Sequence, residues 1–208
     1  MLKAIAWDFD GVLNRNIRDG RFLWAERFED DLGQSLDAFN RFVFGDRWDR
    51  ILTGQEDLRD RLTQWADVVG FEGGADRMLD YWFSRDAWPD PAMLRLMDQA
   101  ADQGITQVIA TNNEAHRAAY IETEMGFGPR VEHIFASGRM GVRKPDPAFF
   151  NQITATLGTS PSDMLLIDDH PPNIEAAQQL GWQTFLFTGT EYDDLADTLM
   201  LFSFTFRG

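Results

Sequence analysis

Two aspartates follow a short apolar run near the start of the chain, and their type and spacing could support chemistry. Residues 4–7 read AIAW, which is typical of a buried strand, and Asp8 and Asp10 come directly after it. Side chains at positions i and i+2 of a strand lie on the same face, so the two carboxylates are expected side by side. Their mutual repulsion and their loss of water would both cost free energy. That cost indicates a functional role for the pair.

Polar side chains also follow the other predicted strands. They are Thr111, Asn112 and Asn113 after one strand, Asp168 and Asp169 after another, and Lys144 just before a proline-led helix. Each group taken alone has a structural explanation, as a turn residue, a helix cap or a solvated lysine. Those explanations would have to hold at four strand ends at once. A shared site at one edge of a sheet is the better interpretation.

The chemistry expected of this cluster is that of a bound cation. It combines several carboxylates with a hydroxyl and an ammonium, and oxygen ligands of this kind favour Mg²⁺. The three histidines, His116, His133 and His170, are too scattered to form a ligand set. The chain has no cysteine, which excludes disulfides, thiolate zinc sites and a cysteine nucleophile.

A framework of alternating strands and helices must position these side chains. Short apolar runs predict strands at residues 4–7, 106–110, 133–136, 164–167 and 184–187. Helices are predicted between them, at residues 91–103, 114–124, 147–157 and 171–180. The alternation indicates an α/β fold with a parallel sheet flanked by helices. In such a sheet ligands bind at the carboxyl ends of the strands, which is where the acidic pairs lie.

One interval interrupts this alternation. Residues 14–88 contain no convincing strand but several amphipathic stretches, around residues 22–31, 36–44, 56–65 and 75–83. They predict an all-helical insertion that returns through WPDP at residues 88–91. We therefore expect an α/β core domain made of residues 1–13 and 89–208, and a helical domain made of residues 14–88.

Charge and composition limit the partners. The 208 residues include 19 basic and 34 acidic side chains, for a net charge of -15. Such a surface repels phosphate backbones, so nucleic acid is not expected as a general partner. A small phosphorylated substrate would need a local cation. No membrane span or signal peptide is recognised, and a soluble, cytoplasmic protein is expected. The sequence assigns no oligomeric state.

The ordered motifs resemble those of the haloacid dehalogenase superfamily. They are DFDGVL at residues 8–13, ATNN at 110–113, RKPDPAFF at 143–150 and IDDHPPNIEAA at 167–177. The resemblance covers nearly the whole chain outside the insertion, and it implies a Rossmann-like sheet with an inserted all-helical cap of the C1 type. Asn14, Arg15 and Asn16 depart from the usual first motif, and Asn173 stands where other members place a further aspartate. Both departures are compatible with the sugar-phosphatase-like members, and they leave the substrate open.

The resemblance also implies catalytic roles for the first pair. Asp8 would be the nucleophile that forms an aspartyl-phosphate, which splits one displacement into two easier steps. Asp10 would be the general acid and base, and its backbone carbonyl would contact the metal. Thr111 and Lys144 would bind the transferring phosphoryl group and stabilise its charge.

Further binding roles are implied in the same way. Gly11 and Asn112 would contact the substrate. Mg²⁺ would be the cofactor, with Asp8, Asp10, Asp168 and Asp169 in its site and Asp169 favoured over Asp168 as a direct ligand. A bound cation would also reduce the repulsion between an anionic nucleophile and an anionic substrate.

The function expected from these observations is a Mg²⁺-dependent phosphatase of a small phosphorylated metabolite, a sugar phosphate being one candidate. Three alternatives stay open. A phosphomutase would use the same core residues, and the cap would decide between the two. A haloacid dehalogenase would attack carbon and would need neither the acid at Asp10 nor a metal. A non-catalytic binding protein on the same scaffold is the third.

Several residues of the insertion could select the substrate. Arginines could neutralise a second anionic group, and tryptophans could stack on a sugar or a base. The candidates are Arg15, Arg18, Arg47, Arg50, Trp24, Trp48 and Trp82. For most of them a structural role is the stronger interpretation, as solvated arginines and core tryptophans.

Overall fold

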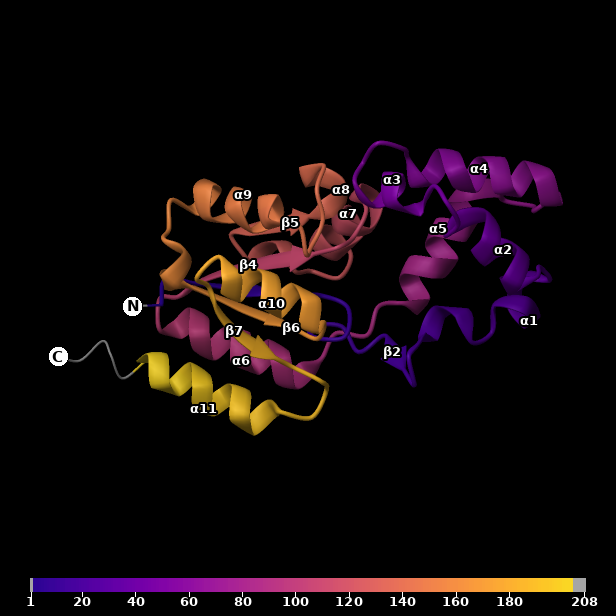
Figure 1. Cartoon of the computed structure of the whole chain (residues 1–208). Coiled ribbons are helices and arrows are strands. Elements are labelled where there is room, and N and C mark those ends of the chain that lie inside the picture. The colour runs from indigo at the N-terminus through magenta and orange to yellow at the C-terminus, as the bar shows by residue number, and fades with distance from the viewer. Residues whose placement is uncertain (1, 204–208) are drawn as a thin grey trace.

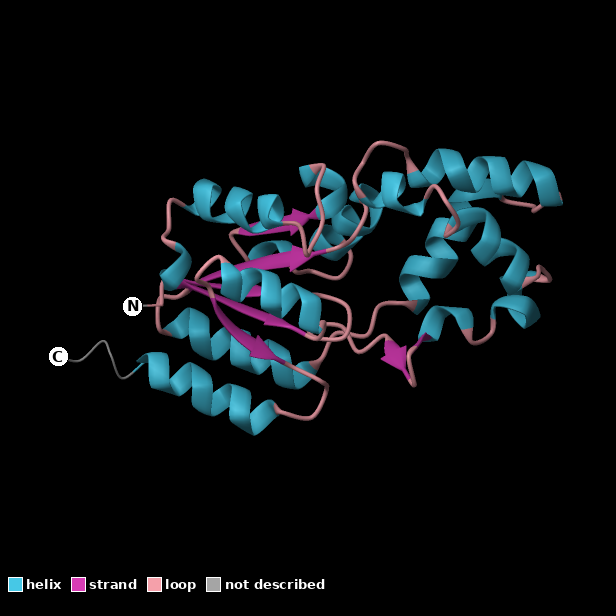
Figure 2. Ribbon diagram, in the orientation of Figure 1, coloured by secondary structure: helices cyan, strands magenta, loops and turns pink. Residues whose placement is uncertain are grey.

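A sheet of five parallel strands, with helices packed around it, forms one part of the computed structural model, which describes residues 2–203 (Figure 1). The strands lie in the order β5-β4-β1-β6-β7. Their bounds are β1 Ala4–Trp7, β4 Thr106–Thr111, β5 His133–Ala136, β6 Met164–Asp168 and β7 Gln183–Leu186. Helices cover both faces (Figure 2). The predicted α/β class, a Rossmann-like parallel sheet flanked by helices, is confirmed.

The helices of the core follow the strands in alternation. Their bounds are α6 Pro91–Asp102, α7 Ala115–Thr123, α8 Ser137–Met140, α9 Pro147–Leu157, α10 Pro171–Gln179 and α11 Tyr192–Ser203, with short 3-10 turns η2 Gly128–Arg130 and η3 Pro161–Asp163. Asp90 caps α6 by accepting hydrogen bonds from the first backbone N–H groups, and proline follows at its first position. Gly158, in the left-handed conformation, ends α9.

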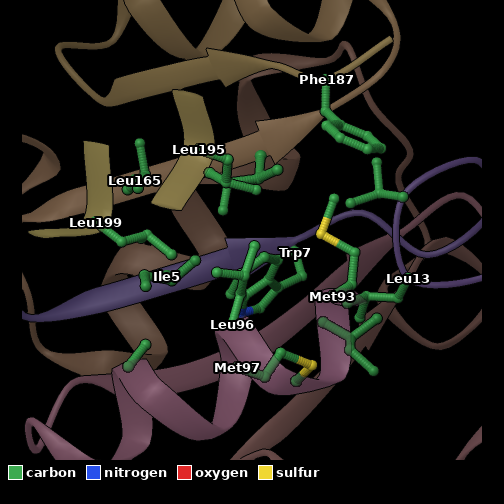
Figure 3. Packing of buried hydrophobic residues seen from close by; sticks show 14 of the residues in the cluster. Ile5, Trp7, Leu13, Met93, Leu96, Met97, Leu165, Phe187, Leu195 and Leu199 are labelled. Carbon is green, nitrogen blue, oxygen red and sulfur yellow. The ribbon is translucent and has the colours of Figure 1, made fainter. Parts of the chain in front are cut away.

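The side chains of β1 explain how the two layers of helices pack. Alternate residues of a strand point to opposite faces, and all four residues of β1 are buried. Ile5 and Trp7 join a cluster that includes residues of α6, α7 and α11 (Figure 3). Ala4 and Ala6 face the opposite side, where the small side chains leave room for Phe149 and other residues of α9 and α10.

The order of the strands creates the switch point at which a site is expected. From β1 the chain moves outward to β4 and β5, then crosses back to β6 on the other side of β1. The carboxyl ends of β1 and β6 therefore meet where the strand order reverses. Trp7 pairs with Ile167 in this register, and the backbone N–H of Asp8 donates to the Ile167 carbonyl at 2.8 Å. Asp8 is thus brought to the end of β6.

An insertion between β1 and α6 lies beyond the carboxyl ends of the strands, whose arrowheads point toward it (Figure 2). It contains β2 Ile17–Arg18, β3 Arg21–Phe22, η1 Leu23–Ala25, α1 Phe28–Leu32, α2 Leu36–Val43, α3 Trp48–Leu52, α4 Leu58–Val69 and α5 Gly74–Arg85. The insertion has its own buried cluster, which is rich in aromatic residues. Trp24, Phe28, Phe39, Trp65 and Trp82 belong to it.

The insertion is not entirely helical, which corrects one expectation. Ile17 pairs with Phe22 and Arg18 with Arg21 in a small antiparallel hairpin. The two residues between the strands, Asp19 and Gly20, both have positive φ, at 49° and 72°. An Asp-Gly pair favours this type of two-residue turn, so the dipeptide itself was the missed signal.

Within residues 2–203, none of the helices combines the length and the apolar character that crossing a membrane requires. The cytoplasmic location expected from the sequence stays a prediction.

Candidate active site

A buried lysine joins two strand ends at the switch point. Lys144 Nζ lies 2.9 Å from Asp8 Oδ1 and 2.6 Å from Asp168 Oδ2, and its side chain is 1% exposed. Burial alone would lower the pKa of the Lys144 ammonium, but the carboxylates of Asp8 and Asp168 outweigh it and hold the pKa above its ordinary value. The side chain is therefore a fixed positive charge at the centre of the site.

The segment that carries Lys144 is held by Asn112. The Asn112 side-chain amide donates to the Lys144 carbonyl at 2.9 Å, and its oxygen accepts from the Lys144 N–H at 2.8 Å. This two-point contact fixes the lysine segment to the residue that follows β4. Both polar groups of the Asn112 side chain are used in this way, and a contact with substrate stays a prediction.

Three carboxylates gather around the lysine. Oxygen atoms of Asp8, Asp168 and Asp169 all lie within 4.8 Å of one another. Burial raises the pKa of Asp8 well above its ordinary value, the Asp168 charge adds to the increase, and Lys144 opposes it. Burial and Asp168 likewise raise the pKa of Asp169. One ammonium does not balance three carboxylates, so this all-oxygen set fits a divalent cation such as Mg²⁺.

The two adjacent aspartates after β6 have different surroundings. Asp168 accepts hydrogen bonds from Lys144 Nζ, from the His170 N–H at 2.9 Å and from Asn173 Nδ2 at 2.9 and 3.1 Å. Donors therefore hold both of its oxygens. Asp169 lies instead against Gly11, where a Cβ would come within 2.3 Å of Asp169 Oδ2. Gly11 also has φ +86°, so glycine is needed there for two reasons.

Asparagines surround the second aspartate of the opening motif. Asp10 Oδ1 accepts from Asn14 Nδ2 at 3.1 Å and from Asn16 Nδ2 at 2.7 Å. Asp10 Oδ2 accepts from Asn113 Nδ2 at 2.9 Å, and the same nitrogen lies 2.7 Å from Thr111 Oγ1. Asn113 therefore connects Asp10 to Thr111. Sequence reasoning assigned these asparagines no role, although amide-rich stretches after two strands were a visible signal.

A second buried charge pair lies at the base of the insertion. Arg117 Nη2 is 3.3 Å from Asp86 Oδ2, and Arg117 also donates to the carbonyls of Phe83 and Asp86. Burial and the nearby Asp10 charge outweigh Arg117 and raise the pKa of Asp86 to about 8. Asp86 Oδ1 and Asn16 Oδ1 are buried, and neither has a hydrogen-bond partner among the described residues. Neither Asp86 nor Arg117 belongs to a motif that marks it in the sequence.

A cavity of about 1200 Å³ opens between the insertion and this edge of the sheet. Asp10, Asn112 and Asn113 lie on its core side. The insertion side includes aromatic rings, from Phe22, Trp24, Phe44, Trp48, Trp82 and Phe83. The three tryptophans considered from the sequence thus line the cavity, and Trp24 and Trp82 also belong to the buried cluster of the insertion.

The four candidate arginines of the insertion lie elsewhere. Arg15 pairs with Asp90, and Arg18 pairs with Glu26. Arg47 and Arg50 both pair with Glu56. None of the four lines the 1200 Å³ cavity in the part of the chain that the structure describes.

The insertion also contacts the core along one side of the cavity. Asp57 Oδ2 lies 2.9 Å from His116 Nε2, and Asp49 pairs with Arg143 at 2.9 Å. Burial would raise the pKa of Asp57, but hydrogen bonds from His116 and from backbone N–H groups hold it below its ordinary value. Between the two segments that connect the insertion to the core, Asn14 donates to the Asp86 carbonyl and accepts from the Trp88 N–H, both at 2.7 Å. These contacts hold the insertion against the core in this conformation.

Comparisons with known proteins agree with this arrangement. A family model described as haloacid dehalogenase-like hydrolase matches residues 2–181. Among curated relatives, sesquiterpene phosphatase astK of Aspergillus oryzae is 25% identical over 182 residues, which is 86% of either chain.

Two solved structures show the same fold. A HAD family enzyme from Bacteroides thetaiotaomicron, in complex with magnesium and inorganic phosphate, has a TM-score of 0.73 at 20% identity and covers 94% of this chain and 99% of that one. A 2-haloacid dehalogenase from Pseudomonas syringae pv. Tomato has a TM-score of 0.65 at 18% identity, with 90% and 86% covered. At these identities the likeness concerns the fold.

Proposed function

Since the chain belongs to the haloacid dehalogenase-like hydrolases, we propose that it is a Mg²⁺-dependent phosphatase that acts on a small phosphorylated metabolite through an aspartyl-phosphate on Asp8. One observation carries the proposal. Lys144 and the carboxylates of Asp8, Asp168 and Asp169 lie together at the switch point, next to Asp10. The name of the Aspergillus relative, a phosphatase that aligns over most of both chains, supports the same reaction class.

The nucleophile is held in one orientation. Asp8 Oδ1 accepts from Lys144 Nζ and from the Phe9 N–H at 2.7 Å, so the other oxygen, Oδ2, is the one that attacks phosphorus. The bond from phosphorus to the substrate oxygen breaks as the bond to Asp8 forms. Asp10 gives its proton to the departing alkoxide, and in the second step takes a proton from the water that attacks the aspartyl-phosphate.

The remaining residues bind the charge of the transferring group. Lys144 and the Thr111 hydroxyl are the donors on this edge. The Gly11 N–H donates to the Asn14 carbonyl at 2.9 Å and the Phe9 N–H to Asp8 Oδ1, so these two backbone groups serve to shape the loop. When bound to Asp8, Asp169 and the Asp10 carbonyl, Mg²⁺ would neutralise nucleophile and phosphoryl oxygens. Asp169 is the preferred side-chain ligand over Asp168, because donors already hold both oxygens of Asp168.

The surroundings of Asp10 favour phosphoryl transfer over dehalogenation. Displacement of a halide from carbon requires neither a general acid nor a metal, yet three asparagines orient the Asp10 carboxylate. Asp169, which the proposed phosphatase would use to bind Mg²⁺, would also have no role in dehalogenation. Phosphomutase activity is the second candidate, because a mutase would use the same groups.

We also propose that residues 14–88 act as a cap domain that closes over the cavity and excludes water. Asn14 joins the two chain segments that connect the insertion to the core, so hinge motion would break its hydrogen bonds to Asp86 and Trp88. Hydrogen exchange at residues 14–16 and 86–90 should therefore slow when Mg²⁺ and a phosphate analogue are added. Unchanged exchange at both segments would contradict a moving cap.

The reaction is tested by phosphate release from a panel of phosphate esters with Mg²⁺ and then with excess EDTA. Release should require Mg²⁺ and should be abolished in Asp8→Asn, while Asp30→Asn, a change on the exposed surface of α1, should leave it unchanged. Acid quenching during turnover should trap phosphate on the unmodified protein and not on Asp8→Asn. Halide release from haloacids without phosphate release would favour the dehalogenase, and transfer to a second hydroxyl of the substrate would favour the mutase.

A further inference from the structure

The size of the cavity and the composition of its walls limit the alcohol that the phosphate could be attached to. We propose that the substrate is the phosphate monoester of a bulky, apolar alcohol that has no second negative charge. This inference rests on the proposed phosphatase function, and it departs from the sugar phosphate considered from the sequence.

The cavity is larger than a small polar substrate needs. Its volume of about 1200 Å³ exceeds the roughly 300–1,000 Å³ typical of ligand pockets. It begins at Asp10, Asn112 and Asn113, which neighbour the proposed reaction centre at Asp8, and continues into the insertion. A glycerol or glycolate group on the phosphate would leave most of this volume unfilled, whereas a bulky group would extend into it.

The deeper wall consists of aromatic rings that contact one another. Trp24 and Trp82 lie 5.0 Å apart between ring centroids, and Phe44 lies 5.3 Å from Trp82 and 4.6 Å from Trp48. These rings come from η1, α5, the end of α2 and α3, so four segments converge on one apolar surface. Burying hydrocarbon against such a surface contributes about 25 cal/mol for each Å² of apolar area removed from water.

The polar lining forms two groups, one at the core edge (Asp10, Asp86, Asn112, Asn113, Glu114 and Arg117) and one on the outer part of the insertion. Phe22, 44% exposed, marks the mouth, and the polar side chains of α2 that face the cavity, Asp37, Asn40 and Arg41, are exposed or half-buried. Hydroxyl groups of a sugar placed against the inner rings would lose water without gaining equivalent partners. An apolar group would not have this cost.

The charges around the cavity disfavour a second anionic group. Its described lining includes five acidic side chains, Asp10, Glu26, Asp37, Asp86 and Glu114, against three arginines, Arg21, Arg41 and Arg117. A pKa of about 8 keeps Asp86 mainly protonated at neutral pH, so four of the five contribute negative charge there. Arg117 is already bonded to Asp86 and to the Phe83 carbonyl. None of the arginines considered from the sequence lines the cavity: Arg15 pairs with Asp90, and Arg47 and Arg50 pair with Glu56, outside it. Arg18 pairs with Glu26, which is part of the lining. A carboxylate or a second phosphate on the substrate would therefore meet an excess of negative charge.

A series of primary-alcohol esters tests the inference, because their leaving groups have similar basicity. The series is ethyl, cyclohexylethyl and naphthylethyl phosphate, with glycerol phosphate and phosphoglycolate as polar and anionic members. With Mg²⁺, kcat/KM should rise along the first three by at least about tenfold overall, and phosphoglycolate should be the poorest substrate. Equal or higher kcat/KM for glycerol phosphate or phosphoglycolate would overturn the inference. No phosphate release from any ester would instead overturn the phosphatase function.

A pair of variants tests where the apolar group binds. Phe22→Ser removes an exposed ring at the cavity mouth, and Val68→Ser is its control, since Val68 is 73% exposed on α4 and does not line the cavity. Phe22→Ser should raise the KM for naphthylethyl phosphate at least about threefold and leave the KM for glycerol phosphate unchanged. Val68→Ser should alter neither KM. Equal effects on both esters would contradict the placement.

A binding measurement is independent of turnover. Cyclohexylethanol should change the tryptophan fluorescence of the unmodified protein and should compete with naphthylethyl phosphate, because it would bind beside Trp48 and Trp82. Glycerol at the same concentration should do neither. If cyclohexylethanol does not compete, the cavity does not bind the apolar group.

Discussion

Lys144 Nζ lies 2.9 Å from Asp8 Oδ1, and both side chains are buried where β1 ends. The ammonium balances Asp8 and Asp168 in the resting protein, and in the reaction proposed above it would also bind phosphoryl oxygens. If that proposal holds, one contact contributes to both the stability and the activity of the protein.

Replacing this lysine should cost both properties. In Lys144→Met the chain retains a side chain of similar length but loses the charge, so the rate should fall roughly 100- to 1,000-fold. Without Mg²⁺, the buried carboxylates would lose their partner, and the free energy of unfolding should fall by about 3 kcal/mol. Lys3→Met, at the chain's only other lysine, removes an exposed pair with Asp163 and should change neither.

Urea unfolding with and without Mg²⁺ separates the two effects. Added Mg²⁺ should restore part of the stability of Lys144→Met, because a cation also compensates the carboxylates, and should not restore the rate. A variant as stable as the unmodified protein in EDTA would show that the ammonium does not balance this cluster.

Two glycines with similar backbone angles provide a matched test of the metal site. Gly11 and Gly20 have φ +86° and +72°, so alanine at either position should cost about 1 kcal/mol of stability. A Cβ added at Gly20 would have nothing within 4 Å, whereas one added at Gly11 would force the Asp169 carboxylate to move. Gly11→Ala should therefore raise the Mg²⁺ concentration for half-maximal phosphate release roughly 10-fold or more, and Gly20→Ala should not. Equal Mg²⁺ dependence in both would mean that Asp169 is not a direct ligand.

Features that depend on local sequence pattern were predicted correctly from the sequence. The convergence of the polar residues could be predicted because a parallel sheet brings the carboxyl ends of its strands to one edge. The limits of β1 could be predicted because the charged residues Lys3 and Asp8 flank its apolar run. Helix α9 was also placed correctly, since Pro147 and Gly158 mark its limits. These features depend on local pattern and on a general rule of topology.

Other features depend on contacts that no local pattern encodes. Residues 22–31 were predicted as one helix, but the structure has a strand end, a 3-10 turn and α1, because Trp24 packs into the aromatic cluster. The short α3 and the C-terminal α11 were not predicted. The Asp86–Arg117 pair joins residues 31 positions apart, and only the packing of α5 near α7 brings them together.

Asp86 should make stability depend on pH. Its pKa is about 8 in the folded protein and near 3.8 when unfolded, so folding favours the protonated carboxyl. The stabilising contribution is complete below about pH 4 and is lost as pH rises through 8. Asp86→Asn should remove this loss, and its stability at pH 9 relative to pH 5 should exceed that of the unmodified protein by on the order of a few kcal/mol.

Urea titrations at pH 5, 7 and 9 measure this difference. Asp8 and Asp169 titrate in the same direction, but they are present in both proteins and cancel in the comparison. Asp80→Asn, on the exposed side of α5, is the control and should follow the unmodified protein. If Asp86→Asn has the same pH dependence as that control, the Asp86 carboxyl is already ionised in the folded state at neutral pH.

Asp10 is the residue whose loss should depend on the leaving group. An alkyl alcohol departs as a strongly basic alkoxide and needs a proton, whereas nitrophenol departs as a stable anion. Asp10→Asn keeps the size of the side chain and its backbone carbonyl. In Asp10→Asn, however, the new side-chain NH₂ group would face the NH₂ group of Asn113, and two donors cannot form a hydrogen bond. The variant is therefore compared with the double variant Asp10→Asn/Asn113→Asp, in which residue 10 donates and residue 113 accepts. That second variant controls for displaced neighbours.

The comparison must use the first turnover, because hydrolysis of the aspartyl-phosphate is common to all substrates and also needs the base. Rapid-quench measurement of alcohol or nitrophenol release should show that both variants retain at least about tenfold more of the original rate with nitrophenyl phosphate than with an alkyl phosphate. Mg²⁺ dependence of the first turnover should be unchanged, since the carbonyl at position 10 remains. Equal losses on both esters would assign the proton to another group, and the Asp10 carboxylate would then serve only to position Asn113 and Thr111.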